Sequence, residues 1–441
     1  MWLRMRRAQR RTLEPRRWRL HGVTIVMVAL GCSGTNGPAS QSTGSGGTTG
    51  ATGATGVGAT GGVAAGGADQ GVTGQGGAPP GGTTGAGGST GGSAGAATGG
   101  SAGEGGTGAT GGSGATAGVG GGTGGGGGIP GDRCDVAVHD PANPPGMLST
   151  SGTLSPTHDP TVIEQDGTFY LFRTGGGLPG RTSSDLENWS NASAAFSNST
   201  TPWVSEEVPA ARDLWAPDLS YFNGRYHIYY SASSFGENDS CIGHATRDSM
   251  DSGNWTDHGS VHCTSGSDNY NAIDPNIIVD IDGSVWMFFG SHWDGIKAIE
   301  LDPTGMTTMG DLYDIAARPQ APRAIEAPVV VRRCGYYYLF VSFDQCCGNW
   351  TDAGGVPYNI RVGRSESLLG PYVDKDGTPM YPDGGGTLLV GPGGQWDALG
   401  HNAVIFAGDR AYNIYHAYNP QTLRVAELVW DAEGWPISGG P

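Results

Sequence analysis

NYNAIDPNIIVDIDGSVWMFFGSHWDGI, residues 269–296, contains in one place the features that recur through the rest of the chain. Asp274-Pro275 precedes a short β-branched run, Asp282-Gly283 marks a tight turn, and an aromatic run follows. Two apolar runs separated by an Asp-Gly pair are the sequence pattern of a β-hairpin. The stretch therefore predicts two antiparallel strands, with an acidic residue at the entrance of the first strand.

Four other segments repeat this order of a β-branched strand, a turn containing Gly and an aromatic strand. The residues equivalent to Pro275 recur at spacings of 57, 58, 53 and 74, and the set is Pro160, Pro217, Pro275, Pro328 and Asn402. A repeat of this length has room for four strands, which is the content of a propeller blade. The sequence predicts an all-β fold, a five-bladed β-propeller, without a long amphipathic helix. A two-sheet sandwich also has many strands, but it does not explain five copies of one hairpin.

The residues just before the first strand of each blade are expected to meet at one mouth of the central channel, because that strand lines the channel. These residues are Asp159, Trp215, Asp274, Glu326 and His401. Glycoside cleavage needs one carboxylic acid to protonate the leaving oxygen and one carboxylate to deprotonate a water. A third carboxylate raises the pKa of the acid by like-charge repulsion. A single Asp or Glu beside Pro is more often a turn residue, but three at one register favour catalysis.

The chain before the propeller divides into two segments of different composition. Residues 1–32 contain many arginines, an apolar run at 23–30 that is too short to span a membrane, and Cys32, and they resemble a bacterial lipoprotein export signal. Residues 33–131 are almost entirely Gly, Ala, Thr and Ser, which bury no core and predict a disordered linker. We expect a lipid on Cys32 and an outer-membrane or cell-surface location. Ordinary signal-peptidase cleavage, which leaves a secreted protein, is the alternative.

The remaining residues, 132–441, are predicted to form one catalytic domain, and the charge of the chain limits its ligands. The formal net charge of −17 argues against nucleic acid, which needs a basic face. It also disfavours an acidic polymer as the direct substrate. We therefore expect a neutral ligand. We also expect a monomer that contacts a membrane only through the lipid on Cys32.

Six cysteines remain if Cys32 carries the lipid, and an even number in an exported protein predicts disulfides. Cys241 and Cys263 bracket a hairpin-length segment and are expected to pair. The adjacent Cys346 and Cys347 are expected to pair with Cys334 and Cys134, in an order that the sequence leaves open. A zinc site is disfavoured because no paired CxxC spacing occurs.

An ordered set of motifs resembles glycoside hydrolase family 43, and within it the endo-1,5-α-L-arabinanases. The resemblance covers nearly all of residues 150–440. The motifs are HDP (158–160), LWAPD (214–218), SSFGEN (233–238), NYNAIDPN (269–276), IEAP (325–328), YNIRVGRS (358–365) and GGGTLL (384–389).

The resemblance implies a five-bladed propeller that hydrolyses internal α-1,5 bonds of arabinan with inversion. It implies that Asp159 is the general base, Glu326 the general acid, and Asp274 the residue that modulates the pKa of the acid and orients it. It also implies that His401 approaches an axial metal ion, usually calcium, which is held largely by water. A histidine that is merely hydrogen-bonded in the channel is the alternative.

Further residues are expected to contact the sugar. The aromatic rings of Trp215 and Phe235 suit the C–H faces of furanose rings, although packing between blades is an alternative role for each. The arabinanases usually carry Phe where His292 stands, so this position departs from the pattern of the family. The complete expected set is Trp215, Phe235, Gly236, Asn271, Ala272, Ile273, Ser291, His292 and Trp293.

Two alternatives keep the same fold. An exo-acting α-L-arabinofuranosidase or β-xylosidase would share the three carboxyl groups and differ in the loops that block one end of the cleft. A carbohydrate-binding propeller without activity would be expected to lack one of Asp159, Asp274 or Glu326, and all three are present.

Overall fold

The computed structural model describes residues 134–321, 323–347 and 356–441. The expected export signal, the expected lipid site at Cys32 and the expected linker lie outside these residues. Within the described ranges the chain forms strands β1 to β21 and one four-residue helix, α1 (Val204–Glu207). No helix in these ranges is long and apolar enough to cross a membrane.

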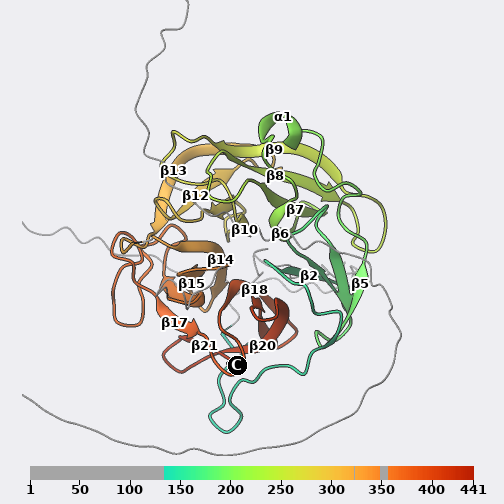
Figure 1. The fold of residues 1–441 in the computed structure, drawn as a ribbon. Helices are drawn as coiled ribbons and strands as arrows, with labels where there is room; N and C mark the ends of the chain where they lie inside the picture. Colours follow the sequence, from blue (N-terminus) through green and yellow to red (C-terminus); the bar gives the residue numbers. More distant parts are fainter. Residues whose placement is uncertain (1–133, 322, 348–355) are drawn as a thin grey trace, which may run out of the picture. The chain divides into compact units, whose positions relative to one another are not determined.

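The strands form five sheets around a central axis (Figure 1). Blade 1 contains β2 (Thr161–Gln165), β3 (Thr168–Phe172), β4 (Gly180–Ser183) and β5 (Asn188–Ala192). Blade 2 contains β6 (Trp215–Phe222), β7 (Arg225–Ala232), β8 (Ser240–Arg247) and β9 (Thr256–Thr264). Blade 3 contains β10 (Asn276–Val279), β11 (Val285–Phe289), β12 (Ile296–Leu301) and β13 (Thr308–Ala316). Blade 4 contains β14 (Ile325–Arg333), β15 (Tyr336–Phe343), β16 (Asn359–Ser365) and β17 (Thr387–Val390). Blade 5 contains β18 (Leu399–Ala407), β19 (Arg410–Ala417), β20 (Thr422–Trp430) and β21 (Pro436–Ser438).

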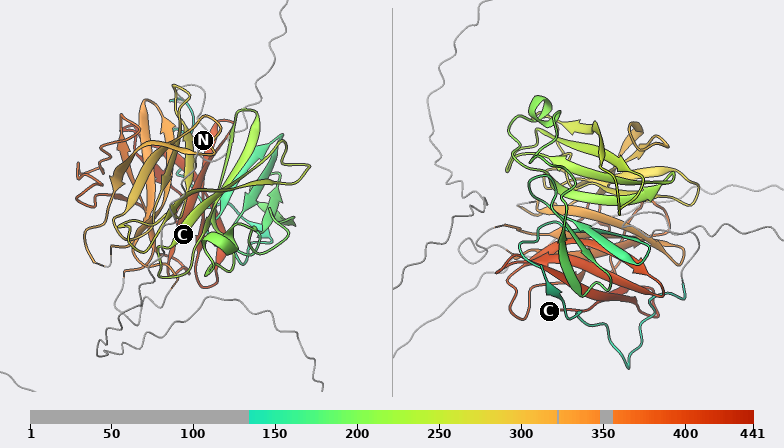
Figure 2. Two further views of the ribbon diagram at one scale, coloured as in Figure 1. Left: turned by 90° about the horizontal axis from the view of Figure 1, so that it is seen from above. Right: turned by 90° about the vertical axis from the view of Figure 1, so that its right-hand side faces the viewer.

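The first strand of each blade contacts the first strands of both neighbouring blades, and the ring closes where β18 contacts β2. Large hydrophobic clusters fill the spaces between neighbouring blades. Ile163 of blade 1 and Leu219 of blade 2 belong to one such cluster, for example, and Ile278 of blade 3 and Val330 of blade 4 belong to another. Figure 2 shows the sheets from two further sides. The predicted five-bladed propeller is confirmed.

The hairpins follow from the turn residues. In three blades a two-residue turn joins the first two strands, and both turn residues have positive φ, as a type I′ turn requires. The φ angles are 51° and 78° at Asp166-Gly167, 50° and 73° at Asn223-Gly224, and 53° and 79° at Cys334-Gly335. Such a turn fixes the register of the second strand against the first.

A segment before blade 1 crosses several blades, and we call residues 134–152 the N-terminal arm. Its backbone pairs with the third strand of blade 5, through Leu148 N–H to Val425 O at 2.9 Å and His139 N–H to Trp430 O at 2.9 Å. Its last part is β1 (Ser151–Gly152), which runs parallel to β5 of blade 1. The arm therefore joins blade 5 to blade 1 across the point where the ring closes.

Two disulfides occur among the described residues. Cys241 pairs with Cys263 across β8 and β9, as predicted, and Cys134 pairs with Cys334. The expectation that Cys346 and Cys347 would pair with Cys134 and Cys334 is wrong. Cys334 lies in the hairpin turn before β15, whereas Cys346 and Cys347 follow this strand. Eight extended residues span about 27 Å, so these cysteines lie at opposite ends of blade 4.

Candidate active site

The entrance to the first strand has the same backbone conformation in every blade. The residue directly before each aligned Pro or Asn has positive φ, which is uncommon for residues other than Gly. The angles are 49° at Asp159, 42° at Ala216, 57° at Asp274, 56° at Ala327 and 48° at His401. A β-bulge follows in blades 2, 4 and 5. Such irregularities re-aim side chains at the mouths of folds of this kind.

The backbone N–H of each of these residues is bonded to the preceding blade. Ser231 Oγ accepts the N–H of Asp274 at 2.9 Å, and Ser342 Oγ accepts that of His401 at 2.8 Å. His416 Nδ1 accepts the N–H of Asp159 at 3.1 Å. These acceptors lie at the end of the second strand of each blade. They fix the entrance residues of neighbouring blades relative to one another.

In blade 4 a carboxyl group replaces this acceptor. The N–H of Ala327 donates to Asp274 Oδ2 at 3.2 Å. The equivalent hydroxyl, that of Ser291, donates instead to Glu326 Oε2 at 2.7 Å. Asp274 and Glu326 are thereby brought together at the entrance of the first strand of blade 4. Asp274 accepts the backbone N–H that a second-strand side chain accepts in the other blades, and the Ser291 hydroxyl is left to bind Glu326.

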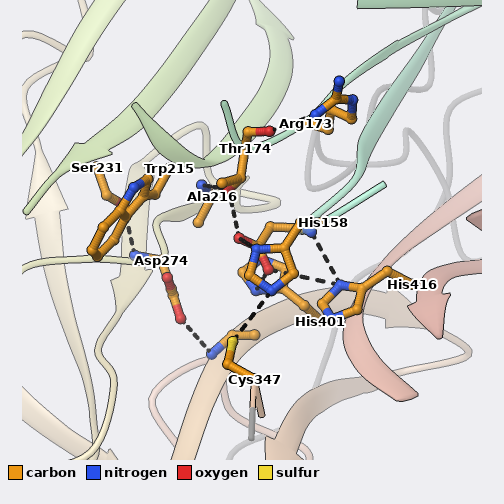
Figure 3. Close-up of polar contacts among 12 residues, drawn as sticks. His158, Arg173, Thr174, Trp215, Ala216, Ser231, Asp274, Cys347, His401 and His416 are labelled. Atoms are coloured by element: carbon orange, nitrogen blue, oxygen red, sulfur yellow. Dashed lines mark hydrogen bonds and ion pairs between the residues drawn. The ribbon is translucent and has the colours of Figure 1, made fainter. Parts of the chain in front are cut away.

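Asp159 lies among groups from four segments of the ring (Figure 3). Its Oδ2 accepts a hydrogen bond from the Thr174 hydroxyl at 2.5 Å and lies 3.1 Å from His158 Nδ1. Its Oδ1 lies 3.0 Å from His401 Nδ1 and 3.7 Å from His416 Nδ1. Burial opposes ionisation, but the positive charges of His158 and His401 outweigh it and hold the pKa of Asp159 well below its usual value. Asp159 is therefore a carboxylate at neutral pH.

Asp274 differs from Asp159 in charge state. Burial raises its pKa to about 8, with the charges of Glu326 and Asp159 adding to the shift and that of His401 opposing it. Asp274 is therefore largely protonated at neutral pH, because its burial and the nearby carboxyl groups of Glu326 and Asp159 disfavour a further negative charge. An ionised Asp159 beside a carboxyl group that retains a proton is an arrangement that suits acid–base chemistry.

His401 faces a cavity on the propeller axis. The cavity has a volume of about 310 Å³, including the solvent open to it, and its lining contains all five aligned residues, Pro160, Pro217, Pro275, Pro328 and Asn402. Asn402 is one of these lining residues, and its Oδ1 atom is buried without a hydrogen-bond partner among the described residues. His401 directs Nδ1 to a carboxylate, as metal-binding histidines commonly do with the ring nitrogen that does not bind metal. His401 carries a second ring proton in the absence of a cation, because, although burial opposes the shift, the neighbouring carboxylates raise its pKa to about 9. A cation that displaces this proton would fit the pair of donors and take most of its ligands from water.

The expected sugar-contacting residues divide into exposed and buried groups. Phe235 is 84% exposed, and Gly236 lies beside it with φ of 83°. Trp215 is half-buried at the mouth, where its ring N–H donates to Asp213 Oδ1 at 2.9 Å. Phe235 thus presents a free aromatic surface, and Trp215 presents part of one.

The stretch before Asp274 is buried instead. Ala272 is fully buried in the cluster between blades 2 and 3, so its side chain offers no surface to a sugar. Asn271 and Ile273 are 2% and 8% exposed, and Asn271 Oδ1 has no protein partner among the described residues. Of this stretch, Asn271 therefore retains a buried polar atom that no described protein group satisfies.

The stretch after β11 lies against Glu326. Ser291 donates to Glu326, and His292 Nε2 lies 3.9 Å from the same Oε2. His292 and Trp293 both have positive φ, 56° and 42°. The imidazole of His292 is therefore a neighbour of the expected acid, which its sequence position alone did not reveal.

Sequence reasoning missed the residues that hold the expected catalytic groups. These are His158, Thr174, Ser231, Ser342 and His416, most of which lie at the ends of the second strands. The signal was present, since a polar residue follows the aromatic run in each copy of the repeat. These polar residues can be assigned to the site only when it is known that this end of the strand faces the next blade.

Comparisons with known proteins agree with this geometry. The sequence model of glycosyl hydrolases family 43 matches residues 155–436. The chain is 44% identical over 289 residues to the extracellular endo-α-(1→5)-L-arabinanase 1 of Bacillus subtilis, covering 63% of this chain and 86% of that protein. It is 38% identical over 301 residues to the extracellular exo-α-(1→5)-L-arabinofuranosidase ArbA of Cellvibrio japonicus, covering 63% and 85%.

A solved structure is similar as well. The family 43 endo-arabinanase of Bacillus licheniformis superposes with a TM-score of 0.60 and 41% identity, covering 66% of this chain and 99% of that one. The family match spans the five blades and every expected catalytic residue. The chain belongs to glycosyl hydrolases family 43.

Proposed function

We propose that the protein is an arabinan endo-1,5-α-L-arabinosidase that hydrolyses internal bonds with inversion of configuration. The observation that carries the proposal is the convergence of Asp159, Asp274 and Glu326 at one mouth of a family 43 propeller. The relative with 44% identity is named an endo-arabinanase, and the net charge of −17 suits a neutral polysaccharide.

Asp159 is the general base of the proposed mechanism. Its carboxylate is ionised and is oriented by Thr174, His158 and His401 before any substrate binds. It takes a proton from a water, whose oxygen attacks the anomeric carbon from the face opposite the leaving group. One displacement of this kind inverts the anomeric configuration.

Glu326 is the general acid, and Asp274 is its partner. Asp274 is largely protonated at neutral pH and does not add a negative charge beside Glu326. Glu326 delivers a proton to the oxygen of the breaking bond, while the Ser291 hydroxyl donates a hydrogen bond to its Oε2 atom. Asp274 lies beside Glu326, and negative charge on both carboxyl groups at once is disfavoured.

His401 and Asn402 are the residues that would hold a hydrated cation, which we propose to be calcium. Such a cation would supply positive charge beside the carboxylates and would lower the cost of keeping them ionised. His401 orients Asp159 through its other ring nitrogen, since Nδ1 lies 3.0 Å from Asp159 Oδ1.

Chelation should therefore reduce activity and thermal stability together, and readdition of calcium should restore both.

The sugar chain is proposed to lie across the mouth, in contact with Phe235, Gly236 and Trp215 on one side. Ser291, His292 and Trp293 lie beside the acid and bound the other side. The buried Asn271 and Ile273 shape the wall next to Asp274.

Replacing Phe235 with Ala should raise KM for arabinan several-fold with little effect on kcat, because the ring is far more exposed than any catalytic group.

The exo-acting alternative is favoured by one comparison, the 38% identity to an exo-acting arabinofuranosidase. The two functions differ in the products formed at the start of the reaction. We expect linear arabinan to give a ladder of arabino-oligosaccharides and a rapid fall in viscosity. Arabinose alone, or one short product from the first time point, would contradict the endo-acting assignment.

We further propose that the protein is exported and works as a monomer. Both reported relatives are named extracellular enzymes. A lipid on Cys32 and a long Gly-rich linker would hold the propeller at the cell surface within reach of a polymer. Mass spectrometry of the mature N-terminus tests this, since cleavage without acylation would contradict it.

A further inference from the structure

We propose that Cys346 and Cys347 are a redox-sensitive modification site beside the base Asp159. Oxidation joins the two neighbouring residues in a disulfide and changes how His158 is held against Asp159. The existence of the site stands on the geometry of the two thiols. Its effect on catalysis rests on the function proposed above.

The sulfur of Cys347 is connected to the base through a single imidazole (Figure 3). Cys347 Sγ lies 3.6 Å from His158 Nε2 and 3.3 Å from Tyr418 Oη. Tyr418 Oη lies in turn 2.8 Å from His158 Nε2. The other ring nitrogen of His158 lies 3.1 Å from Asp159 Oδ2. A change at this sulfur is therefore transmitted to the base through one ring.

The two cysteines are arranged as a nucleophile and its resolving thiol. Both are thiols in the structure, both are half-buried, and the Cys346 thiol donates a hydrogen bond to Cys347. That bond, together with those from His158 and Tyr418, lowers the pKa of Cys347 to about 5 although burial opposes the shift. The Cys347 thiolate is thus the reactive group, and Cys346 keeps its proton.

The two disulfides of the described chain indicate that the thiols of this protein are exposed to an oxidant. Cys134–Cys334 and Cys241–Cys263 are disulfides, which form and persist in oxidising compartments. An oxidant of the low-molecular-weight disulfide class, such as oxidised glutathione, suffices for the neighbouring pair.

The exchange proceeds in two balanced steps. The Cys347 thiolate attacks one sulfur of the small disulfide, forming a mixed disulfide and releasing one thiolate. Cys346 then loses its proton to that thiolate and attacks the Cys347 sulfur, which forms the Cys346–Cys347 bond and releases the second thiolate, protonated from solvent. The pair gives up two electrons and the one proton of Cys346, solvent supplies the second proton, and the small disulfide is reduced to two thiols.

The product should be easily reduced. Adjacent Cα atoms lie about 3.8 Å apart, whereas protein disulfides usually join Cα atoms about 4.4 to 6.8 Å apart. Strained disulfides are the labile and regulatory ones. We therefore assign the pair a reversible role, in contrast to the two disulfides that link separate strands or segments.

In the disulfide, the Cys347 sulfur has no negative charge and its position is set by Cys346. The contact with His158 is lost, and Tyr418 alone holds the outer nitrogen of the ring. A base oriented less well lowers the rate of the chemical step without altering substrate binding. We expect oxidation to lower kcat about tenfold and to leave KM nearly unchanged.

The modification itself is tested without reference to activity. The purified full-length protein is incubated with oxidised glutathione or with mild dithiothreitol, alkylated after denaturation and digested. The peptide that contains both cysteines should carry no alkyl group after oxidation and two after mild reduction. Cys346→Ser should instead keep one glutathione on Cys347. A peptide alkylated twice after oxidation, or a wild-type peptide that keeps glutathione, would overturn the proposal.

The effect on catalysis is tested with the same two samples on linear arabinan. Wild type should regain its kcat on reduction, and Cys347→Ser should have the same kcat in both samples, since it retains a hydroxyl near His158 but forms no disulfide. Equal kcat for oxidised and reduced wild type would contradict the coupling to His158. Absence of arabinan hydrolysis in both states would contradict the proposed function and leave the mass result standing.

Discussion

Asp159 is oriented by side chains that lie far from it in the sequence. Thr174 and His158 bind one of its oxygens, and His401 binds the other. Hydrogen bonds of this kind hold a catalytic group in place before the substrate arrives. The position of Asp159 in a repeated motif was evident from the sequence. Its partners were not, because they come from other copies of the repeat.

Glu326→Gln tests the assignment of the acid. The amide cannot give a proton to the leaving oxygen, so kcat on arabinan should fall about 10²- to 10⁴-fold. An aryl arabino-oligosaccharide with an acidic phenol as leaving group needs little protonation, and its hydrolysis should be largely retained. Measuring both substrates with one enzyme preparation provides the control, and an equal loss on both would argue against Glu326 as the acid.

The pKa of Asp274 predicts the alkaline limit of activity. Its raised value of about 8 means that Asp274 keeps its proton below that pH and loses it as the pH rises above it, which adds a negative charge beside Glu326. A plot of kcat/KM, which reports the free enzyme, should therefore fall on the alkaline side with a midpoint near pH 8. Asp274→Asn should displace that midpoint as well as lower activity. An unchanged alkaline midpoint in this variant would refute the assignment.

The second strands of the blades contribute to the site through the residues at their ends. Thr174 accepts the N–H of Ala216 at 2.7 Å and donates to Asp159, so it links blade 2 to the proposed base in blade 1. Sequence periodicity predicted these strands and their turns, since Asn-Gly and Asp-Gly pairs require the conformations that they adopt. It did not predict the left-handed residues at the strand entrances. Those are imposed by tertiary contacts and not by local preference.

Thr174→Val tests this link between blades. Valine has the same shape but leaves Asp159 without a charge-assisted hydrogen bond and the Ala216 N–H without an acceptor. We expect kcat/KM to fall about tenfold to a hundredfold, with most of the change in kcat. Thr182→Val, on β4 of the same blade, is the matched control and should retain full activity. Similar losses in both variants would indicate a general effect on blade 1.

The N-terminal arm is the feature of the whole molecule that the sequence did not predict. It precedes the family match, which begins at residue 155, yet it pairs with blade 5 and with blade 1. Cys134–Cys334 and hydrogen bonds from Arg333 to Val136 O attach its start to blade 4. The arm has none of the repeated pattern, so only the folded structure reveals its place. The boundaries expected for the export signal and linker stay predictions.

Removing Cys134–Cys334 should therefore cost more stability than removing Cys241–Cys263. The first closes a loop of 200 residues and the second one of 22. Loop-closure entropy alone predicts a difference of about 2 kcal/mol in the free energy of unfolding. Denaturant unfolding of the two Cys→Ala double variants measures it. A smaller loss for the Cys134–Cys334 variant would show that the arm contributes little to closure of the ring.

In the proposed mechanism, one ring of carboxyl groups hydrolyses arabinan by a single displacement. Proton NMR of linear 1,5-α-arabinan, recorded during the first minutes of hydrolysis, distinguishes this mechanism from a double displacement. We predict that β-anomeric reducing ends appear first, on oligosaccharides of several lengths, and that α-anomers grow in by mutarotation. Reducing ends that are α from the start would contradict the roles given to Asp159 and Glu326.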